Sequence, residues 1–557
     1  MTVMLIPCAG NIAIDMQAEF GPIPAALLPV GKDFALMATL KPVVDLYAKV
    51  MVGFSNPPAF VQNAVDRNYA NVEIVDVGQT RSLGETIQRL LERLPPGTTN
   101  ICIQMGDAFH PAVQRGFDTV YYSMEAAVNR WVSFEFDRSS GFHSIAMPGA
   151  STRSTLGTAF AGKFEISNPI EFAAELKTQL LAPSGKIDPF YRAIAKYFNS
   201  RPSEAELLIE TKDWIDFGYS SSYFDYRRKV GFNSRSFNSL VFNDVKKSVV
   251  KRSENRAKLA EEINWYSQLP GDLADLYPRI YAQSDDKLNP WIETEYSVAL
   301  PMDQLFMYSK LDATVWARIF TQLKFALERF SQHRSITGNV SLRKQLPAMC
   351  QSVYLRKTAD RLAEIKNHPT FAAFKGNSVT VNSKPCLGLD AVIAQLPAVV
   401  TSFLEKYESI PSLIHGDLCF SNILYDHRLD HVRFIDPRGS FGVNGAAGDL
   451  RYDLAKLLHS ASGSYDFLVN EHFEMSIENS DITLNILTRE HSSPVTALCD
   501  SLVRHFVGDS GAGVRFIESL LFLSMIPLHA DRAPVQQALL SVGLQQFTES
   551  LREMDLA

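Results

Sequence analysis

A short stretch of the sequence holds polar side chains whose spacing suits chemistry on a charged ligand. Residues 412–439 read SLIHGDLCFSNILYDHRLDHVRFIDPRG, with His-Gly-Asp at 415–417, then Asn422, then Asp436 at the end of an apolar run. One carboxylate can accept the proton of a hydroxyl. An amide and a second carboxylate offer the oxygen ligands that Mg²⁺ prefers, and phosphates supply the rest. These residues therefore predict phosphoryl transfer to an alcohol.

The apolar runs around these residues predict the elements that position them. PSLIHGD is predicted to be a short strand into a tight loop, and NILYD and VRFID to be the strands of a hairpin joined by HRLD. Asp417 then lies on a loop, Asn422 at the start of one strand and Asp436 at the end of the next. From about Met302 the chain is predicted to be mostly helical up to this segment, and helical again after it.

These motifs resemble the catalytic loop of the aminoglycoside phosphotransferase and choline kinase group, relatives of the protein kinases. The pattern of that group is HGDxxxxN, followed by an apolar strand ending in Ile-Asp, and GDLRYDLAKLLHS resembles its GDPxxDLA helix. A lone HGD is more often a simple turn, but matches in register with a second motif favour the catalytic interpretation. The resemblance implies roles for several residues: catalytic Asp417 and His415, the Mg²⁺ ligands Asn422 and Asp436, and Asp453 as a brace of the loop.

The residues before this segment resemble the nucleotide-binding lobe of the same group. KKSVVKRS places Lys251 on a strand, where the resemblance implies contact with the phosphates of ATP. The following helix offers Glu262, or Glu261 beside it, to hold that lysine. Lys246 and Lys247 compete with Lys251 for this role, and the alternative is that all these charges are ordinary surface residues.

The linker between the two lobes is matched by PWIETEYSVALPMDQLF, where the backbone from Glu295 to Ser297 would meet adenine. Two departures from the group's pattern stand out. SFNSLVFND contains no glycine where a loop over the phosphates is expected, and IDPRG replaces the commoner Ile-Asp-Trp/Phe-Glu/Asp. Arg438 in IDPRG follows the metal-binding Asp closely, a position that suits contact with a phosphate or an anionic substrate.

The first part of the chain alternates short apolar runs with helical patterns, which is typical of a parallel α/β sheet. VMLIPCAG, VEIVDV and NICIQMGD are predicted strands, and MATLKPVVDLYAKV and SLGETIQRLLERL are predicted helices. Segments in the same order resemble the sugar-phosphate nucleotidyltransferases: PCAG with PIPAALLPVGKDFAL, then SLGETI, NICIQMGDAF and DWIDFGYSSSYFDYRR. A Rossmann-like sheet is the fold that this resemblance implies.

The nucleotidyltransferase resemblance also implies a site. The turn at Gly10 would reach the nucleotide phosphates, the loop at Gly84 would read the base, and Asp107 and Asp216 would bind one Mg²⁺. The alternative is that Asp107 caps a helix and that Asp216 pairs locally.

The same segments depart from the family's pattern at two phosphate contacts. After Gly10, NIAIDM lacks the second glycine and the arginine of GxGxR, and Ala25 stands where the family has a phosphate-binding lysine. Lys32 and Lys163 are the candidate replacement cations in this half of the chain.

Between them the resemblances cover nearly the whole chain, as a nucleotidyltransferase-like domain at 1–231 and a kinase-like domain at 232–557, with lobes at about 232–300 and 301–557. The order resembles bacterial proteins of capsule and surface-polysaccharide loci that fuse these two domains. It implies a kinase that phosphorylates an alcohol or sugar with ATP and Mg²⁺, and a nucleotidyltransferase that joins the product to CTP or another NTP. Two alternatives are a kinase with a degenerate N-terminal module, and a regulatory pseudoenzyme.

The composition limits where the protein acts and on what. The chain has 557 residues, too many for one core, and a net charge of −7, which argues against a nucleic-acid partner. Six cysteines without CxxC pairs are typical of a reducing compartment. No signal peptide is evident, and the apolar stretch at 519–530 is short and contains a proline. We therefore expect a cytoplasmic protein without a transmembrane segment, with homo-oligomerisation left open.

Overall fold

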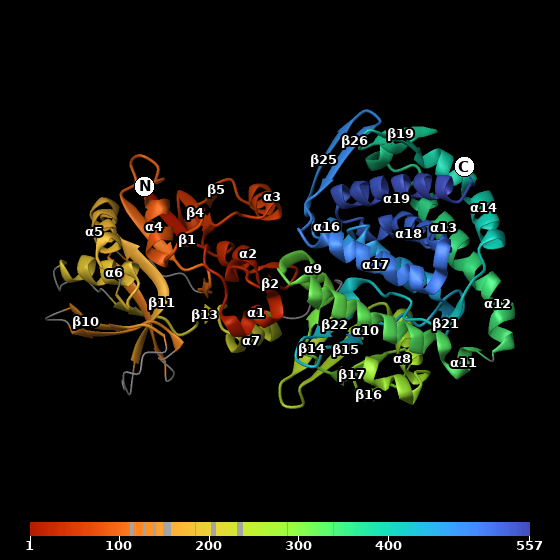
Figure 1. Cartoon of the computed structure of the whole chain (residues 1–557), viewed down its shortest axis with the longest axis horizontal. Helices are drawn as coiled ribbons and strands as arrows, with labels where there is room; N and C mark the ends of the chain where they lie inside the picture. Colours follow the sequence, from red (N-terminus) through yellow and green to blue (C-terminus); the bar gives the residue numbers. More distant parts are fainter. Residues whose placement is uncertain are drawn as a thin grey trace. The chain divides into compact units, whose positions relative to one another are not determined.

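The computed structural model describes residues 1–111, 116, 118–125, 130–137, 141–148, 157–183, 185–201, 208–230, 238–286, 288–337 and 339–556. The chain forms two compact units, Met1–Val230 and Gly231–Ala557 (Figure 1). The predicted domain boundary near 231–238 falls mainly on residues 231–237, which lie outside the described residues.

The N-terminal unit is a mixed α/β domain built on a Rossmann-like parallel sheet, as the alternating pattern predicts. Its strands are β1 (Thr2–Pro7), β4 (Lys49–Phe54), β5 (Val72–Asp76), β6 (Asn100–Gln104), β8 (Thr119–Glu125), β9 (Ser133–Asp137), β10 (Gly141–Ala146), β11 (Gly157–Ile166) and β12 (Leu208–Glu210). Within the described ranges they pair in the order β10-β9-β11-β6-β1-β4-β5, with β8 beside β11 and β12. The strands β6, β1, β4 and β5 run parallel, and β11 is antiparallel to β6.

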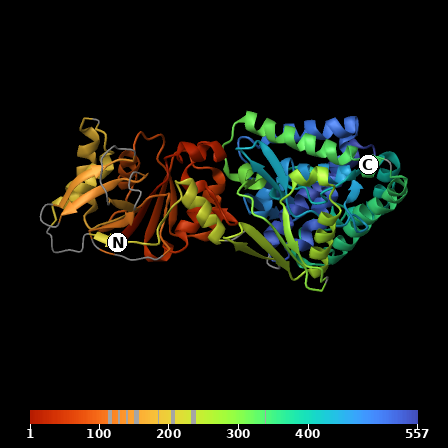
Figure 2. The same cartoon turned by 90° about the horizontal axis from the view of Figure 1, so that it is seen from below.

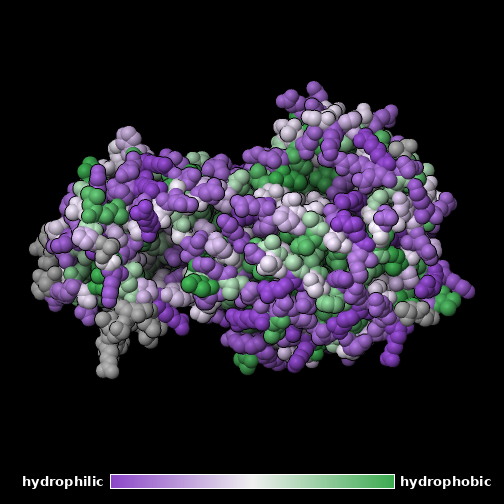
Figure 3. All heavy atoms as spheres, viewed as in Figure 1, coloured by the Kyte–Doolittle hydropathy of each residue, from purple (hydrophilic) through white to green (hydrophobic). Residues whose placement is uncertain are grey.

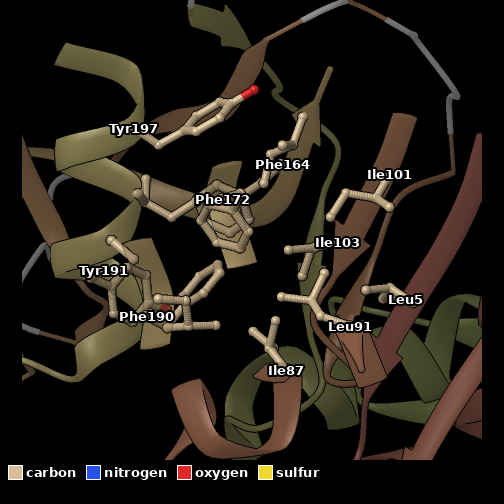
Figure 4. Packing of buried hydrophobic residues seen from close by; sticks show 14 of the residues in the cluster. Leu5, Ile87, Leu91, Ile101, Ile103, Phe164, Phe172, Phe190, Tyr191 and Tyr197 are labelled. Carbon is tan, nitrogen blue, oxygen red and sulfur yellow. The ribbon is translucent and has the colours of Figure 1, made fainter. Parts of the chain in front are cut away.

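Helices cover this sheet and close its core. They are α1 (Ile14–Phe20), α2 (Ala35–Leu40), α3 (Ala59–Asn68), α4 (Leu83–Leu91), α5 (Pro169–Leu181), α6 (Pro189–Asn199) and α7 (Ser220–Val230). Ile87 of α4, Phe172 of α5 and Phe190 of α6 pack with Leu5 and Ile103 from the sheet (Figure 4). Burial of these apolar side chains, each worth about 1.5–3 kcal/mol, holds the helices on the sheet.

The helix predicted over MATLKPVVDLYAKV is wrong in its second half. α2 ends at Leu40, a short 3₁₀ turn covers Val44–Leu46, and β4 begins at Lys49. Pro42 has no backbone N–H to continue the hydrogen bonds of the helix. The apolar run that follows is buried on both faces of a parallel sheet, and such a strand cannot be told from a buried helix by periodicity.

The second unit begins with an antiparallel sheet and one helix. The strands are β14 (Asn238–Asn243), β15 (Ser248–Ser253), β16 (Ile280–Gln283) and β17 (Trp291–Glu295), and the helix is α8 (Arg256–Ser267). The sheet order is β14-β15-β17-β16. The side chain of Asn255 caps α8 by accepting from the amide of Lys258 at 3.2 Å. Both the hairpin and the helix agree with the sequence prediction.

The rest of the second unit is mainly helical. Its helices are α9 (Met302–Tyr308), α10 (Ala313–Gln332), α11 (Arg334–Thr337), α12 (Val340–Cys350), α13 (Lys357–Ile365), α14 (Leu389–Lys406), α15 (Leu450–Ala461), α16 (Tyr465–Val469), α17 (Ser492–Val507), α18 (Gly511–Met525) and α19 (Ala533–Glu553). Helix α10 packs against α17, and α18 packs against α19 and α15. Figures 1 and 2 show this helical part of the second unit in green to blue.

Two hairpins interrupt the helices that were predicted to be continuous. They are β19 (Ser378–Val381) with β20 (Lys384–Leu387), and β25 (Phe473–Glu478) with β26 (Asp481–Ile486). β19 and β26 pair in parallel, so the hairpins form one sheet. Apolar and polar residues alternate in FEMSIE and DITLNI, which is the pattern of half-buried strands. The signal was therefore present in the sequence.

The stretch Ser492–His529 is apolar and long enough, by length and composition alone, to cross a membrane. It spans α17 and α18, and 72% of its most apolar window is buried inside the protein. In this structure it is a core element of the second unit. The face of the molecule shown in Figure 3 is mostly hydrophilic, with apolar residues in scattered patches.

A buried acid inside this helical core gives the second unit a pH-dependent stability. Glu518 of α18 accepts hydrogen bonds from Gln546 of α19 at 2.9 Å and from Ser462 at 3.3 Å. Burial raises the pKa of Glu518 to about 7. Because this folded-state pKa lies above the unfolded one, the acid stabilises the fold fully below the unfolded pKa. That contribution is lost as the pH rises through about 7.

We expect Glu518→Gln to leave stability nearly unchanged at a pH of about 4 and to raise it by up to about 3 kcal/mol at a pH of about 8. The measurement is urea unfolding of the full-length protein across this range. Glu553→Gln, at the exposed end of α19, is the matched control and should show no such change. Parallel stability curves for wild type and Glu518→Gln would contradict the expectation.

Candidate functional site

The HGD loop of the second unit is held by hydrogen bonds to its backbone amides. It follows β21 (Pro411–Leu413), which pairs with β24 (Ala447–Asp449), and it leads through a 3₁₀ turn (Phe420–Asn422) into the hairpin β22 (Ile423–Asp426) and β23 (His431–Phe434). The carboxylate of Asp453 on α15 accepts from the amides of His415 at 2.7 Å and Gly416 at 2.8 Å. The bracing contact that the resemblance implies for Asp453 is therefore present.

His415 supports the loop and does not face a substrate. Its ring is fully buried, with Nε2 2.9 Å from the carbonyl of Ile435 and Nδ1 accepting from the amide of Asp417 at 3.2 Å. Burial lowers the pKa of His415 to about 4, so the ring is neutral at physiological pH. These contacts favour a positioning role for His415 over the predicted catalytic one, because the ring ties Asp417 to Ile435, the residue before Asp436.

Lys251 forms the centre of an ion-pair network. Its Nζ lies 2.7 Å from Glu262 Oε2 and 2.6 Å from Asp436 Oδ1. The structure thus selects Lys251 over its two competitors, because Lys246 pairs with Glu293 and Lys247 with the adjacent turn. It also selects Glu262 over its neighbour in the sequence.

The charges of Lys251 and Asp436 stabilise each other, whereas burial opposes the charge of Glu262. Burial raises the pKa of Glu262 to about 7. Burial alone would lower the pKa of Lys251, but Asp436 and Glu262 hold that pKa above its usual value. Burial would also raise the pKa of Asp436, and the ammonium of Lys251 outweighs that effect and lowers it. At neutral pH the lysine is therefore a fixed cation in the place predicted to face phosphates.

Asn422 and Asp436 each keep an oxygen available for a cation. Asn422 donates its amide nitrogen to the carbonyl of Asp417 at 2.8 Å, so its own carbonyl oxygen points elsewhere. The backbone of Asp436 has φ +56°, in the left-handed region that Asp tolerates better than most residues. Only one of its carboxylate oxygens bonds to Lys251. An amide oxygen and a carboxylate oxygen, with phosphates for the rest, fit Mg²⁺.

Sequence reasoning missed the partner of the predicted base. Lys456 Nζ lies 2.8 Å from Asp417 Oδ1, and the lysine is nearly fully buried. Burial alone would raise the pKa of Asp417, but the Lys456 ammonium holds that pKa well below its usual range. Lys456 follows Asp453 by one turn of α15, so the two residues share a helix face, and this spacing was the available signal.

An Asp with such a low pKa is a weak base until the hydroxyl becomes acidic. In a loose phosphoryl-transfer transition state the nucleophile needs little activation, so orientation would be the larger contribution of a carboxylate placed like that of Asp417. The carboxylate can hold the hydroxyl by a hydrogen bond and take its proton late in the reaction.

Glu295 does not offer its backbone amide to a nucleotide. That amide, at the end of β17, donates to the carbonyl of Arg279 at 2.8 Å, and the amide of Tyr296 donates to Lys247 at 3.0 Å. The side chain of Glu295 pairs with Arg433 at 3.2 Å. Within the segment predicted to meet adenine, Glu295 therefore stabilises the sheet, and backbone amides that donate to a base would come from residues after Tyr296.

In the N-terminal unit, the structure brings Asp107 and Asp216 together. Asp107 follows β6 and precedes β7 (Ala108–Phe109), which pairs with β13 (Ile215–Asp216). A Cβ placed on Gly218 would lie 2.9 Å from Asp216 Oδ1 and 3.3 Å from Asp107 Oδ2, so both carboxylates face the same glycine. Neither caps a helix or forms an ion pair with a described residue. The described contacts do not support helix capping by Asp107, but Asp216 does pair locally, because its Oδ1 accepts from the amide of Gly218 at 2.7 Å.

The two carboxylates oppose each other electrostatically. Burial and then the charge of Asp107 raise the pKa of Asp216 to about 8, against a hydrogen bond from Trp131 Nε1 at 2.7 Å. Burial also raises the pKa of Asp107. The described residues contain no group of three or more His, Cys, Asp or Glu placed to hold a metal. A pair of like charges fits a divalent cation that takes its other ligands from a nucleotide.

The other predicted residues of this unit are placed less favourably. Gly10 is exposed after β1, as a phosphate-facing turn requires. Gly84 is buried at the start of α4, and its amide donates to Asp188 at 3.2 Å, so the amide is not directed at a base. Lys32 is exposed in a turn between two short strands. Lys163 is buried 4.5 Å from the centre of a tyrosine ring and 3.8 Å from Glu165.

Comparison with known proteins gives distant similarities. No protein-family model matches the chain. Two curated proteins match over 132 residues, at 24% and 21% identity: the UDP-N-acetylglucosamine 1-carboxyvinyltransferases of Prochlorococcus marinus strains AS9601 and MIT 9312. Each match covers 20% of this chain and 29% of the relative, so the chain spans less than a third of the length of these proteins.

Among solved structures, the chain is similar to HddC from Yersinia pseudotuberculosis complexed with GMP-PN (14% identity, TM-score 0.30, 42% of this chain and 100% of that one). It is also similar to the CTP:phosphocholine cytidylyltransferase of Streptococcus pneumoniae (9%, 0.31, 41% and 99%). A third is the inositol-1-phosphate CTP transferase of T. maritima (9%, 0.31, 41% and 96%). Similarities of this size do not establish the activity of this chain.

Proposed function

We propose that the second unit is an ATP- and Mg²⁺-dependent phosphotransferase with a kinase-like fold, acting on a hydroxyl of a small alcohol or sugar. The observation that carries this proposal is the bonding of Lys251 to both Glu262 and Asp436, beside a braced loop that holds Asp417 and Asn422. A cation, metal-binding oxygens and an acidic base in one place are the parts that phosphoryl transfer uses.

The protein groups divide the work of this reaction. Lys251 binds the phosphates of ATP, and Glu262 keeps the lysine in place and charged. Asn422 and Asp436 would hold Mg²⁺, which neutralises phosphate charge when bound. Asp417 orients the hydroxyl of the acceptor and takes its proton, while the ion pair with Lys456 at 2.8 Å fixes the carboxylate.

For the N-terminal unit we propose a nucleotidyltransferase that joins the phosphorylated product to CTP or another NTP. The adjacent carboxylates of Asp107 and Asp216 support it, because both would bind one Mg²⁺ with the nucleotide. The two reactions then form a sequence in the cytoplasm that ends in a nucleotide-activated precursor for a capsule or surface polysaccharide.

A second candidate function keeps the phosphotransferase and makes the N-terminal unit a nucleotide-binding or scaffolding module. The observation that favours it is the position of the replacement cations. Lys163 is committed to a tyrosine ring and to Glu165, and Lys32 stands at an exposed turn. Neither takes the place of the missing arginine and lysine that would meet phosphates.

The test of the phosphotransferase is MgATP binding by the full-length protein, together with ADP release against a panel of small alcohols and sugars. We expect Asp436→Ala to abolish Mg²⁺-dependent nucleotide binding, since it removes a metal ligand. We expect Lys251→Met to weaken ATP binding by about tenfold or more. Because Lys251→Met leaves Glu262 buried without its cation, Lys251→Met with Glu262→Gln is the control for folding. Wild-type nucleotide binding by Asp436→Ala would overturn the proposal.

A further inference from the structure

Positively charged side chains gather beside Asp417 in a place that the roles above do not use. Lys357 Nζ on α13 and Arg438 Nη1 after β23 each lie 3.4 Å from the phenol oxygen of Tyr452 on α15. Lys456, one turn further along α15, bonds to Asp417. Elements far apart in the sequence thus bring three cations to one side of the predicted base.

The positive charge of this cluster is not balanced. Within the described part of the second unit, no carboxylate forms an ion pair with Lys357 or Arg438. Asp417 and Glu261 are the acids that act on Arg438 from a longer distance, and each is already bonded to another residue. Cations held in a partly buried place without a counter-ion are costly, so the fold itself gains little from this arrangement.

The pKa values of Lys357 and Tyr452 are both lowered, as expected beside positive charge that no nearby anion balances. Burial lowers the pKa of Lys357, and the cations of Arg438 and Lys456 lower it further. Burial would raise the pKa of Tyr452, but the surrounding cations outweigh it and lower the pKa to about 8. Lys357 and Arg438 both keep part of their surface exposed, so an anion from solvent can reach them.

We propose that the acceptor alcohol carries an anionic group, a carboxylate or a phosphate monoester, which Lys357 and Arg438 bind beside Tyr452 while the reacting hydroxyl faces Asp417. This inference rests on the proposed phosphotransferase. It also limits the size of the acceptor. Tyr452 and Lys456 lie on one face of α15 on neighbouring turns, and the charge of Asp417 acts on both Arg438 and Tyr452, so the anion site and the hydroxyl site are neighbours. Short sugar acids and sugar phosphates have their anionic and hydroxyl groups this close together.

The anionic group takes no part in the bond changes. The hydroxyl oxygen forms a bond to the γ-phosphorus of ATP while the bond from that phosphorus to the β–γ bridging oxygen breaks. ADP leaves with the electron pair of the broken bond, and the hydroxyl proton passes to Asp417 and then to solvent. Binding of the anion places the hydroxyl in line with the γ-phosphorus, so it contributes to orientation.

The experiment compares acceptors that differ only in the anionic group, with the full-length protein and saturating MgATP. One set is glycerol, glycerate and glycerol 3-phosphate, and the other is glucose, glucuronate and glucose 6-phosphate. We expect kcat/KM of an anionic member to exceed that of the neutral one by about tenfold or more. Comparing the carboxylate acceptors with the phosphate acceptors then shows which anionic group the site prefers.

Lys357→Met and Arg438→Gln test the residues themselves. Each should reduce kcat/KM for the anionic acceptor about tenfold more than for the neutral one, with KM for ATP unchanged. Arg356→Met, an exposed cation adjacent to Lys357, is the matched control and should behave as wild type. Preference for the neutral alcohols, or a raised KM for ATP in either variant, overturns the inference while the phosphotransferase stands.

If no acceptor is turned over, calorimetry tests the anion site directly. Inorganic phosphate is titrated into wild type and into the Lys357→Met and Arg438→Gln variants, and we expect binding that both substitutions weaken by about tenfold or more. Equal binding by all three proteins overturns the anion site. Failure of the proposed phosphotransferase function is recognised separately, because the wild-type protein would then not bind MgATP.

Discussion

Replacing Asp417 by asparagine is expected to lower kcat for phosphoryl transfer by about 10²- to 10⁴-fold, with KM for ATP nearly unchanged. Asparagine keeps the shape of the side chain but can neither take the proton nor pair with Lys456. The nucleotide is held by groups that this change does not touch, namely Lys251 and the two metal-binding oxygens. The measurement is ADP release under saturating MgATP, with the acceptor found by screening.

Asp417→Asn also leaves the buried ammonium of Lys456 without its partner, which costs about 3–5 kcal/mol when one member of a buried pair is removed. Asp417→Asn with Lys456→Met is therefore the companion variant, because it should recover stability without recovering turnover. Asp481→Asn, on an exposed hairpin, is the control for an ordinary loss of one carboxylate. Turnover by Asp417→Asn within about tenfold of wild type would remove Asp417 from the reaction.

In the N-terminal unit, Asp107→Asn and Asp216→Asn are each expected to abolish the stabilisation that Mg²⁺ with a nucleotide gives to wild type. A ligand at a hundred times its Kd stabilises by about 2.7 kcal/mol, which is readily seen in thermal unfolding. Release of pyrophosphate should fall by about a hundredfold or more in the same variants. The measurements use CTP, UTP, GTP and ATP in turn, on full-length protein carrying Asp436→Ala, so that the second unit no longer binds Mg²⁺ with a nucleotide.

Folding damage can be distinguished from loss of the metal. Without Mg²⁺, Asp216→Asn should stay within about 1–2 kcal/mol of wild type. The substitution removes the repulsion from Asp107, which offsets the loss of one of two acceptors, Oδ1 for the Gly218 amide or Oδ2 for Trp131 Nε1. Asp213→Asn, exposed on the same segment, is the matched control. No effect of Mg²⁺ on wild type with any of the four nucleotides, and no pyrophosphate released, would leave the N-terminal unit as a scaffold.

The sequence was informative where a local pattern and a local structure coincide. Strands with flanking turns, such as the hairpin β22–β23, and the helix α8 with Asn255 before it were predicted at nearly the observed positions. The prediction was wrong where burial on both faces removes periodicity, as in β4. It also missed β25 and β26, whose alternation was overridden by the expectation of a continuous helical region.

Only those residues of the candidate site that lie close together in the sequence could be predicted. Asp417, Asn422 and Asp436 follow one another within a short motif, and their types reveal their chemistry. Lys357 lies on a helix far upstream, and no local pattern relates it to Arg438 or Tyr452. Such contacts come from packing of distant elements, which a single sequence does not display. For the same reason the choice between Glu261 and Glu262 required the structure.

Helix α8 is fastened to the HGD loop and to the loop after β23 in the second unit. A Cβ on Gly439 would lie 1.9 Å from the carbonyl oxygen of Glu261, so helix and loop meet backbone to backbone. Trp265 Nε1 also donates to the carbonyl of Ile414 at 3.0 Å. Protein kinases are switched off by swinging the corresponding helix outward, which separates the glutamate from its lysine. Fastened at both points, α8 would not swing outward in this way, so for the proposed phosphotransferase we expect the rate to follow substrate concentration and protein abundance and not a conformational switch.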